Sequence, residues 1–313
     1  MTVAATFRQP PALSPGDRVA VIAPASAFDR ESFEAGLAVI AARYETRYAQ
    51  SIFERHRYLA GDDARRAREL SAALTDPAVK AVFCARGGYG AMRLLPELRA
   101  LRAFPLKPLV GFSDITALHL WLQRLGSTSI HGPVLTQLGR LSQGMRARLF
   151  ALLESSSPAA ALLGSHTLVP GVAEGPLLGG CLSVLTRLLG TPYLPALEGA
   201  ILLLEDRGER PYRLDRMWTH LALAGVFARV RGVVLGDFGG CEEPAAPYSS
   251  ADVLRDLAVA TGLPCAGGFP VGHGDANEAV PLGVRVRLDA SVRSLTFLEA
   301  AVSAADRPVS RGV

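Results

Sequence analysis

The stretch "KPLVGFSDITALHLWLQRLG", residues 107–126, decides how the first half of this chain folds. Its apolar start predicts a strand that ends at Phe112, and the segment after it predicts a helix from Asp114 to Gly126. Ser113 stands at the corner between the two. A serine in this place either caps the first turn of the helix or is a nucleophile on a sharp elbow with an exposed oxygen. The local pattern leaves both interpretations open.

Strands and helices alternate on both sides of this stretch. Short runs rich in Val and Ile are followed by longer segments with helical spacing of apolar residues. Such alternation predicts an α/β domain with a parallel sheet covered by helices on both faces. The predicted strands are 18–26, 78–85, 107–112 and 128–134, and the predicted helices are 30–44, 62–77 (capped by Asp62) and 114–126.

The composition changes between residues 142 and 175, where one helix is followed by a stretch rich in Ser, Pro, Ala and Gly. This change predicts an N-terminal domain over 1–155, a linker over 156–175 and a smaller domain over 176–313. The smaller domain mixes parallel and antiparallel signals. Its predicted elements are strands at 199–206 and 231–238, helices at 214–227 and 249–262, and an antiparallel hairpin turning at Ala290 and Ser291.

The overall composition is that of a globular protein with about two domains. The 313 residues carry a formal net charge of +4, and 49 % of them are hydrophobic. The basic residues are scattered, which argues against a nucleic-acid partner. The sequence shows neither a secretory signal nor an apolar run long enough to cross a bilayer, so we expect a cytoplasmic protein without a membrane partner.

The four cysteines form no C-x-x-C pair, and each lies in an apolar or glycine-rich context. We therefore expect free, buried thiols and no metal site. The four are Cys84, Cys181, Cys241 and Cys265.

A glycine-rich segment, "CARGGYGAMRLL" at 84–95, follows one of the predicted strands. Ligand sites in α/β sheets form beyond the carboxyl ends of strands, and glycines there bring backbone N–H groups close to an anion. An ordinary tight turn is the alternative. The segment lacks the G-x-G-x-x-G pattern, so it does not predict a dinucleotide site. Arg86 either binds a substrate carboxylate or is an ordinary surface arginine.

A nucleophilic serine needs a base, and the base needs an orienting carboxylate. His273, between glycines in "GFPVGHGDANEAVPLG", is the first candidate for the base, and His131 in "IHGP" is the reserve. Glu205 and Asp206 follow the apolar run "AILLL" and are the candidate carboxylates. Neighbouring strand residues point to opposite faces, so at most one of the two serves the site. Taken singly, these residues also fit a loop histidine and a solvated strand end.

Several motifs in register then identify a family. "ARGGYG", "GFSDITALH", "HGP", "LLLED" with "YRLDRM", and "GHG" with "VPLG" occur in this order. Together they resemble the LD-carboxypeptidases of murein recycling, serine peptidases that include the microcin C immunity hydrolases. The resemblance runs from about Val19 to Leu298. It implies an N-terminal α/β domain like that of class I glutamine amidotransferases and a smaller β-rich domain of swivelling type.

The resemblance implies a catalytic triad divided between the two domains. Ser113 would be the nucleophile, Glu205 the orienting carboxylate, and His273 the general base and acid. The backbone N–H groups of Asp114 and Gly88 would form the oxyanion hole.

The activity implied is removal of the terminal D-alanine from a murein tetrapeptide, with no metal or cofactor and with a homodimer as the expected assembly. Arg86, Gly87 and Tyr89 are the expected substrate-binding residues. Two rival functions are an immunity-type hydrolase of acyl-nucleotide conjugates and a non-catalytic binder of cell-wall peptides or nucleotides. Many relatives have Asn where this chain has Cys181, to which we assign no catalytic role.

Overall fold

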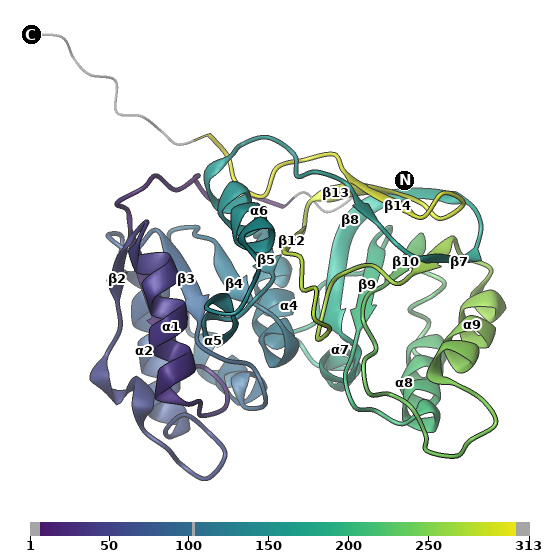
Figure 1. Cartoon of the computed structure of the whole chain (residues 1–313), viewed down its shortest axis with the longest axis horizontal. Coiled ribbons are helices and arrows are strands. Elements are labelled where there is room, and N and C mark those ends of the chain that lie inside the picture. The colour runs from purple at the N-terminus through teal and green to yellow at the C-terminus, as the bar shows by residue number, and fades with distance from the viewer. Residues whose placement is uncertain (1–6, 102–103, 305–313) are drawn as a thin grey trace, which may run out of the picture.

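Two α/β parts lie side by side in the computed structural model, which describes residues 7–101 and 104–304. Figure 1 shows the N-terminal part in purple and blue and the C-terminal part in green and yellow. A six-stranded sheet forms the frame of the first part, and an eight-stranded sheet that of the second. The predicted α/β class, with a mostly parallel N-terminal sheet and a β-rich C-terminal part, is confirmed.

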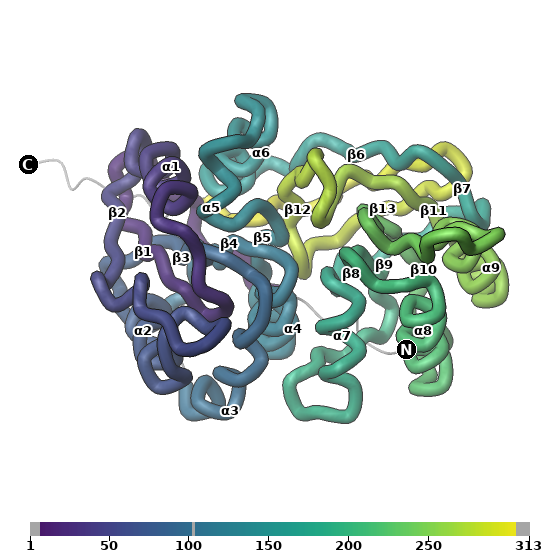
Figure 2. Tube along the Cα trace, turned by 60° about the horizontal axis from the view of Figure 1, so that its bottom comes forward, coloured from purple at the N-terminus to yellow at the C-terminus, as the bar shows by residue number. Residues whose placement is uncertain are grey.

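The six-stranded sheet has the order β12-β5-β4-β3-β1-β2. All of its neighbours pair in parallel except β12, which runs antiparallel to β5. Figures 1 and 2 both show β12 beside β5, so a segment from late in the chain completes the N-terminal sheet. The strands are β1 (Arg18–Ile22), β2 (Glu45–Arg47), β3 (Ala81–Cys84), β4 (Leu109–Gly111), β5 (Ser129–His131) and β12 (Val280–Leu282).

Helices cover both faces of this sheet, because successive strand residues point to opposite sides. Val19 and Val21 pack in one buried cluster with α1, α5 and α6, whereas Ala20 and Ile22 pack with α2, α3 and α4. The side chain of Asp62 accepts a hydrogen bond from the N–H of Arg65, which confirms it as the cap of α2. The helices are α1 (Arg30–Ala41), α2 (Asp63–Thr75), α3 (Leu95–Leu98), α4 (Thr116–Arg124), α5 (Leu135–Leu138) and α6 (Gln143–Glu154), with 3-10 turns η1 (Gln50–Phe53), η2 (Ala91–Leu94) and η3 (Ser113–Ile115).

The eight-stranded sheet has the order β6-β14-β13-β8-β9-β10-β11-β7. Its central strands β8 to β11 are parallel, and the outer pairs are antiparallel. The predicted hairpin is present as β13 and β14, whereas the expected linker 156–175 supplies β6, β7 and the start of β8. The strands are β6 (Leu162–Leu163), β7 (His166–Val169), β8 (Val172–Cys181), β9 (Ile201–Glu205), β10 (Gly232–Leu235), β11 (Cys265–Gly267), β13 (Arg285–Asp289) and β14 (Ser294–Phe297).

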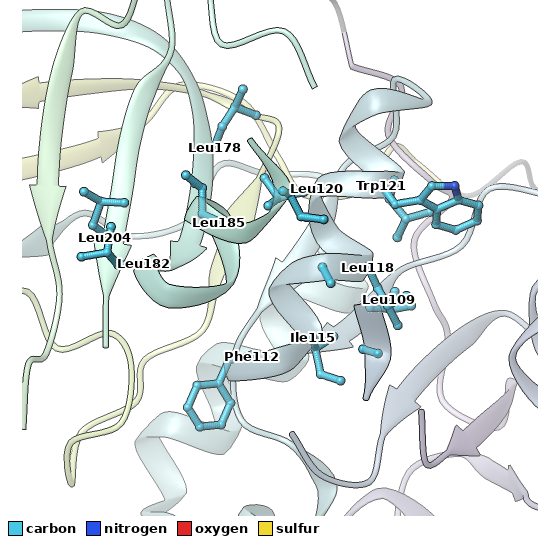
Figure 3. Close-up of a cluster of buried hydrophobic side chains, with 14 of the residues drawn as sticks. Leu109, Phe112, Ile115, Leu118, Leu120, Trp121, Leu178, Leu182, Leu185 and Leu204 are labelled. Carbon is cyan, nitrogen blue, oxygen red and sulfur yellow. The ribbon is translucent and has the colours of Figure 1, made fainter. Parts of the chain in front are cut away.

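One hydrophobic core joins the two parts. It continues from α4 to the face of the second sheet covered by α7 (Leu182–Leu188), α8 (Pro211–Leu223) and α9 (Ser250–Thr261). Figure 3 shows Leu120 of α4 near Leu178 and Leu185 of the second part. Burial of such side chains stabilises the contact by about 1.5–3 kcal/mol each. Helix α4 begins just after Ser113, so this core fixes the elbow relative to the second sheet.

Candidate active site

Ser113 occupies the elbow between β4 and α4. Its φ of +63° lies in the left-handed region, which a residue with a Cβ adopts only under strain. It does not cap a helix: Phe112 and Ile115 hold the cap positions of η3 and α4, and neither cap has a side-chain hydrogen bond. The capping interpretation is therefore wrong. The backbone instead presents the hydroxyl at the carboxyl end of the sheet.

His273 brings the two parts of the chain together at this hydroxyl. It lies in the loop between β11 and β12, and its Nε2 is 3.0 Å from Ser113 Oγ. Its Nδ1 is 2.7 Å from Oε2 of Glu205, which is fully buried at the end of β9. The Phe112 ring packs against the imidazole, with 4.8 Å between centroids.

The close approach of the histidine loop to Glu205 requires a glycine at position 272. Gly272 has a φ of +123°, and a Cβ there would lie 2.7 Å from Glu205 Oε2. Its N–H donates to Oδ1 of the buried Asn277, which holds the loop in place. The glycines around His273 thus let a buried carboxylate and an imidazole meet.

The contact between Glu205 and His273 changes the proton affinity of both groups. Burial alone would lower the pKa of His273, but the hydrogen bond and the charge of Glu205 outweigh burial and raise it. Burial raises the pKa of Glu205, and the hydrogen bond from His273 opposes that rise. A proton taken up by His273 is therefore stabilised by the carboxylate behind it.

Asp206 faces away from this contact. Its carboxylate accepts hydrogen bonds from the N–H groups of Ser183 at 2.7 Å and Arg207 at 2.8 Å. Of the two carboxylates that the sequence offered, Glu205 is thus the one in contact with His273. Asp206 instead ties the loop after β9 to the first turn of α7.

The glycine-rich loop, residues 84–91, lies directly against the elbow. A Cβ on Gly87 would lie 3.0 Å from Ser113 Cβ, so no larger residue fits at 87 without displacing the serine. Gly88 has a φ of +98°, and a Cβ there would clash with Ser26. The Ser26 hydroxyl in turn binds the backbone N–H and carbonyl of Tyr89 at 3.0 and 3.4 Å.

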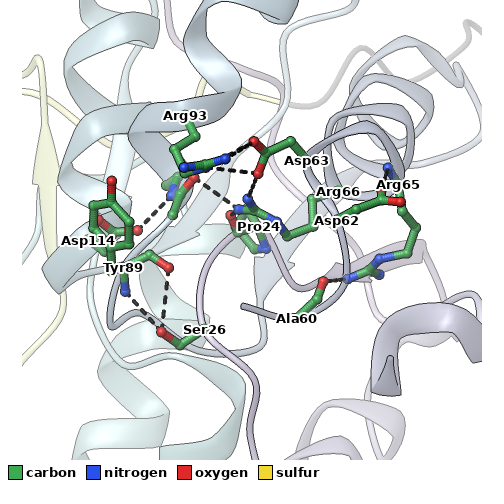
Figure 4. A network of polar contacts seen from close by, with 12 residues as sticks. Pro24, Ser26, Ala60, Asp62, Asp63, Arg65, Arg66, Tyr89, Arg93 and Asp114 are labelled. Atoms are coloured by element: carbon green, nitrogen blue, oxygen red, sulfur yellow. Dashed lines mark hydrogen bonds and ion pairs between the residues drawn. The ribbon is translucent and has the colours of Figure 1, made fainter. Parts of the chain in front are cut away.

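Buried charges hold the same loop from behind, as Figure 4 shows. Asp114 Oδ2 accepts the N–H of Ala91 at 2.7 Å, and burial raises the pKa of Asp114 to about 6. Arg66, also buried, donates to the carbonyls of Pro24 and of Gly90, and it pairs with Asp63. Sequence reasoning missed Ser26 and Arg66. Arg66 belongs to a charged run that is typical of a solvated helix face, so nothing local indicates its burial.

The remaining predicted residues have mixed surroundings. Arg86 is exposed and donates to the Ala27 carbonyl at 2.6 Å, and Tyr89 is exposed beside Tyr58, with 5.8 Å between ring centroids. His131, the reserve base, is buried against Phe112, and within the described residues its ring nitrogens have no hydrogen-bond partner.

The cysteines and possible metal ligands add nothing to the site. All four cysteines are free and buried, as predicted, and burial raises the pKa of the Cys181 thiol. No group of His, Cys, Asp or Glu in residues 7–101 and 104–304 is placed to hold a metal ion. Over the same ranges, no helix is both long and apolar enough to cross a membrane.

Two family models match the chain, one for each part. The description of the first is LD-carboxypeptidase N-terminal domain, over residues 19–132, and that of the second is LD-carboxypeptidase C-terminal domain, over residues 174–288. A relative from Streptomyces coelicolor is 42 % identical over 303 residues, covering 92 % of this chain and 96 % of its own. The murein tetrapeptide carboxypeptidase of Pseudomonas aeruginosa is 38 % identical over 284 residues, covering 85 % of this chain and 91 % of its own.

Solved structures share the fold over nearly the whole chain. The muramoyltetrapeptide carboxypeptidase of Oxalobacter formigenes superposes with a TM-score of 0.79 at 27 % identity, covering 92 % of this chain and 100 % of the other. The microcin C7 self immunity protein MccF superposes with a TM-score of 0.84 at 20 % identity, covering 94 % of this chain and 99 % of the other. The second likeness concerns the fold alone.

Proposed function

This chain belongs to the LD-carboxypeptidase family, and we propose that it removes the terminal D-alanine from murein tetrapeptides by acyl transfer to Ser113. One observation carries the proposal: a continuous hydrogen-bonded chain runs from Ser113 through His273 to the buried Glu205. The names of two relatives, the murein tetrapeptide carboxypeptidase and the muramoyltetrapeptide carboxypeptidase, support the choice of substrate.

In the proposed reaction, His273 takes the hydroxyl proton as Ser113 attacks the carbonyl at the L-centre of the diamino acid. Glu205 orients the imidazole and stabilises its charged form. His273 then gives the proton to the amine of the departing D-alanine. Attack by water, with His273 again as base, releases the shortened peptide. No metal or organic cofactor enters any step.

The negative oxygen of the intermediate would be bound by the N–H groups of Gly88 and Asp114. Within the described residues, neither group donates to an acceptor of the protein itself. Gly87 lies against Ser113, and the hydrogen bond from Ala91 to Asp114 ties the loop to the elbow. One donor thus lies on the elbow itself and the other on a loop tied to it, which is the preorganisation that such stabilisation needs.

Arg86 and Tyr89 are proposed to line the approach to the serine, on the exposed side of the glycine-rich loop. One N–H of Arg86 donates to the Ala27 carbonyl, and the remaining N–H groups are suited to bind a substrate carboxylate. Gly87 leaves room for the scissile bond over Ser113.

The rival activity is hydrolysis of an acyl-nucleotide conjugate. A nucleobase is held by stacking on an exposed aromatic ring. Both tryptophans, Trp121 and Trp218, are buried in the shared core, and the stretch 139–176 contains neither Trp nor Tyr. These observations exclude only the tryptophans and that stretch as a stacking surface, because Tyr58 and Tyr89 are exposed at the glycine-rich loop. The choice of the peptide over the nucleotide conjugate rests on the names of the two relatives.

The test is mass spectrometry of L-Ala-γ-D-Glu-meso-diaminopimelyl-D-Ala after incubation with the purified protein, beside a Ser113→Ala control. The expected result is loss of one alanine with the native protein only. Loss with both proteins would retain the peptidase and reject Ser113 as its nucleophile. If neither acts on the peptide, an acyl-sulfamoyl adenosine is the next substrate to assay. Binding of either compound without turnover would identify a binder.

A further inference from the structure

A cavity of about 590 Å³ lies between α7 and α8, outside the residues assigned above. Figures 1 and 2 both show these helices side by side in the C-terminal part. The size is that of a small-molecule site. Its walls carry Thr186, Arg187, Leu189, Glu209, Arg213, Arg216, Met217 and His220.

The lining of this cavity is cationic. Arg213, Arg216 and His220 follow one another at helical spacing on α8, and Arg187 faces them from α7. Among the described residues, the one carboxylate of the lining is Glu209, which pairs with Arg213 at 3.4 Å. In the part of the chain that the structure describes, Arg187 and Arg216 pair with no carboxylate.

Arg187 and Arg216 are exposed to solvent at the mouth of the cavity, and their contacts are with neutral groups. Arg187 Nη1 donates to the Ser183 carbonyl at 3.1 Å and lies 3.6 Å from the sulfur of Met217. Arg216 lies over the ring of Tyr212, at 5.5 Å from its centre. Guanidinium groups gathered around a cavity without a compensating carboxylate are suited to bind carboxylate or phosphate oxygens.

The cavity is linked along the chain to the strand end that carries Glu205. Glu205 pairs with Cys181 across β9 and β8, and α7 begins at the next residue, Leu182. The Ser183 N–H donates to Asp206, and the Ser183 carbonyl accepts from Arg187. Arg187 therefore lies five residues, about one and a half turns, beyond Leu182, which follows the strand end beside Glu205.

We propose that this cavity binds an anionic group, a carboxylate or a phosphate, on the part of the substrate that remains acylated to Ser113. The inference rests on the proposed function, because it takes the substrate to be a murein peptide. Such peptides carry a carboxylate on the glutamate and a second one on the diaminopimelate, and a nucleotide-linked precursor adds phosphates. Arg187 and Arg216 would then determine which form of the peptide the enzyme prefers.

The experiment compares matched substrates on three variants. Arg187→Gln and Arg216→Gln remove the proposed contacts, and Arg47→Gln is the control, because Arg47 is an exposed arginine on β2 of the other sheet. KM and kcat are measured for the tetrapeptide, for the tetrapeptides amidated at the glutamate or at the diaminopimelate, and for the uridine-diphosphate-linked tetrapeptide.

If a carboxylate occupies the cavity, one amide raises the KM of the native enzyme by about 10-fold or more, with little change in kcat. The two cavity variants lose that preference, and Arg47→Gln keeps it. If a phosphate occupies it, the nucleotide-linked peptide has the lower KM, and only the cavity variants lose that advantage. Substrate preferences that are the same in all variants would overturn the proposal.

A binding measurement distinguishes a protein without peptidase activity from a cavity that does not bind anions. If the native protein cleaves none of these peptides, calorimetric titration with the tetrapeptide and its two amides still measures binding. A carboxylate-dependent affinity that Arg187→Gln removes and Arg47→Gln keeps would retain the cavity as an anion site. Equal affinities in the three proteins would reject it.

Discussion

His273 lies 3.0 Å from Ser113, although 160 residues separate them along the chain and the two follow strands of different sheets. The contact exists because the core between α4 and the second sheet holds the two parts in one arrangement. The site therefore depends on packing far from the reacting atoms, and its geometry leads to the following expectations.

Replacement of Ser113 by glycine or by alanine distinguishes the backbone strain at this position from the catalytic role of its hydroxyl. Glycine adopts a φ of +63° without a steric penalty, and alanine does not. We expect Ser113→Gly to exceed Ser113→Ala in free energy of unfolding by about 0.5–1 kcal/mol, as measured by urea denaturation. Both variants should lose turnover by about 10³-fold or more. A glycine variant less stable than the alanine variant would contradict strain at the elbow.

Glu205→Gln should move the pH profile as well as lower the rate. Only neutral His273 accepts the serine proton, and Glu205 raises the pKa of His273, so the native kcat/KM should rise with pH through a value above the ordinary ~6.5. Removing the carboxylate charge lowers that pKa, so the acid limb should move to lower pH while kcat falls by about 10²–10⁴-fold.

Asp206→Asn is the matched control for this profile. Asp206 also raises the pKa of His273 but does not bind it, so its removal should move the acid limb less than Glu205→Gln does. If the acid limb of the kcat/KM profile does not move in Glu205→Gln, the titrating group is not His273.

Gly88→Ala and Gly190→Ala form a pair that tests the glycine-rich loop. Both glycines have positive φ, +98° and +77°, so each alanine should cost about 1 kcal/mol of stability. A Cβ at 88 would also clash with Ser26, whereas one at 190 has nothing within 4 Å. We expect at least a 10-fold loss of kcat/KM for Gly88→Ala and native kinetics for Gly190→Ala. Equal kinetics in the two variants would exclude the loop from the oxyanion site.

Asp114→Asn should change how stability varies with pH. Burial raises the pKa of Asp114 to about 6, so the native state binds a proton that the unfolded state has lost. Native stability from this group therefore falls as the pH rises from about 4 to 6 and is constant above that. The asparagine variant keeps the acceptor for Ala91 and should lack this decline, a difference of about 2–3 kcal/mol. Parallel curves of unfolding free energy against pH would contradict the shift.

The elements that the sequence predicted are those whose structure depends on neighbouring residues. The alternation of valines in β1, the cap Asp62 and the hairpin of β13 and β14 all follow from the spacing of neighbouring residues. The short strands β2 and β12 have three residues each, and β12 contains a proline, so neither carries a period to detect. Likewise, β6 and β7 lie in a stretch whose Ser, Pro and Gly content is typical of a linker.

The candidate site was predictable where strand ends and glycines indicate it. Ser113 follows one predicted strand, Glu205 lies at the end of another and His273 stands between glycines, and the structure brings the three into contact. The choice of Glu205 over Asp206 was not decided by the strand pattern, because it depends on which side chain meets a loop 68 residues away. The supporting contacts of Ser26 and Arg66 depend on tertiary packing alone.

The pairing of β12 with β5 also constrains how this protein can be rearranged in evolution. A gene fusion that exchanged everything after residue 175 would remove Val280–Leu282 and leave β5 as an open edge beside the buried His131. An exchanged C-terminal half must therefore bring an equivalent three-residue strand in the same register, and with it the preceding loop that carries the histidine. The two halves are therefore coupled through one shared strand, and an exchange that supplied no such strand would expose the edge of the N-terminal sheet.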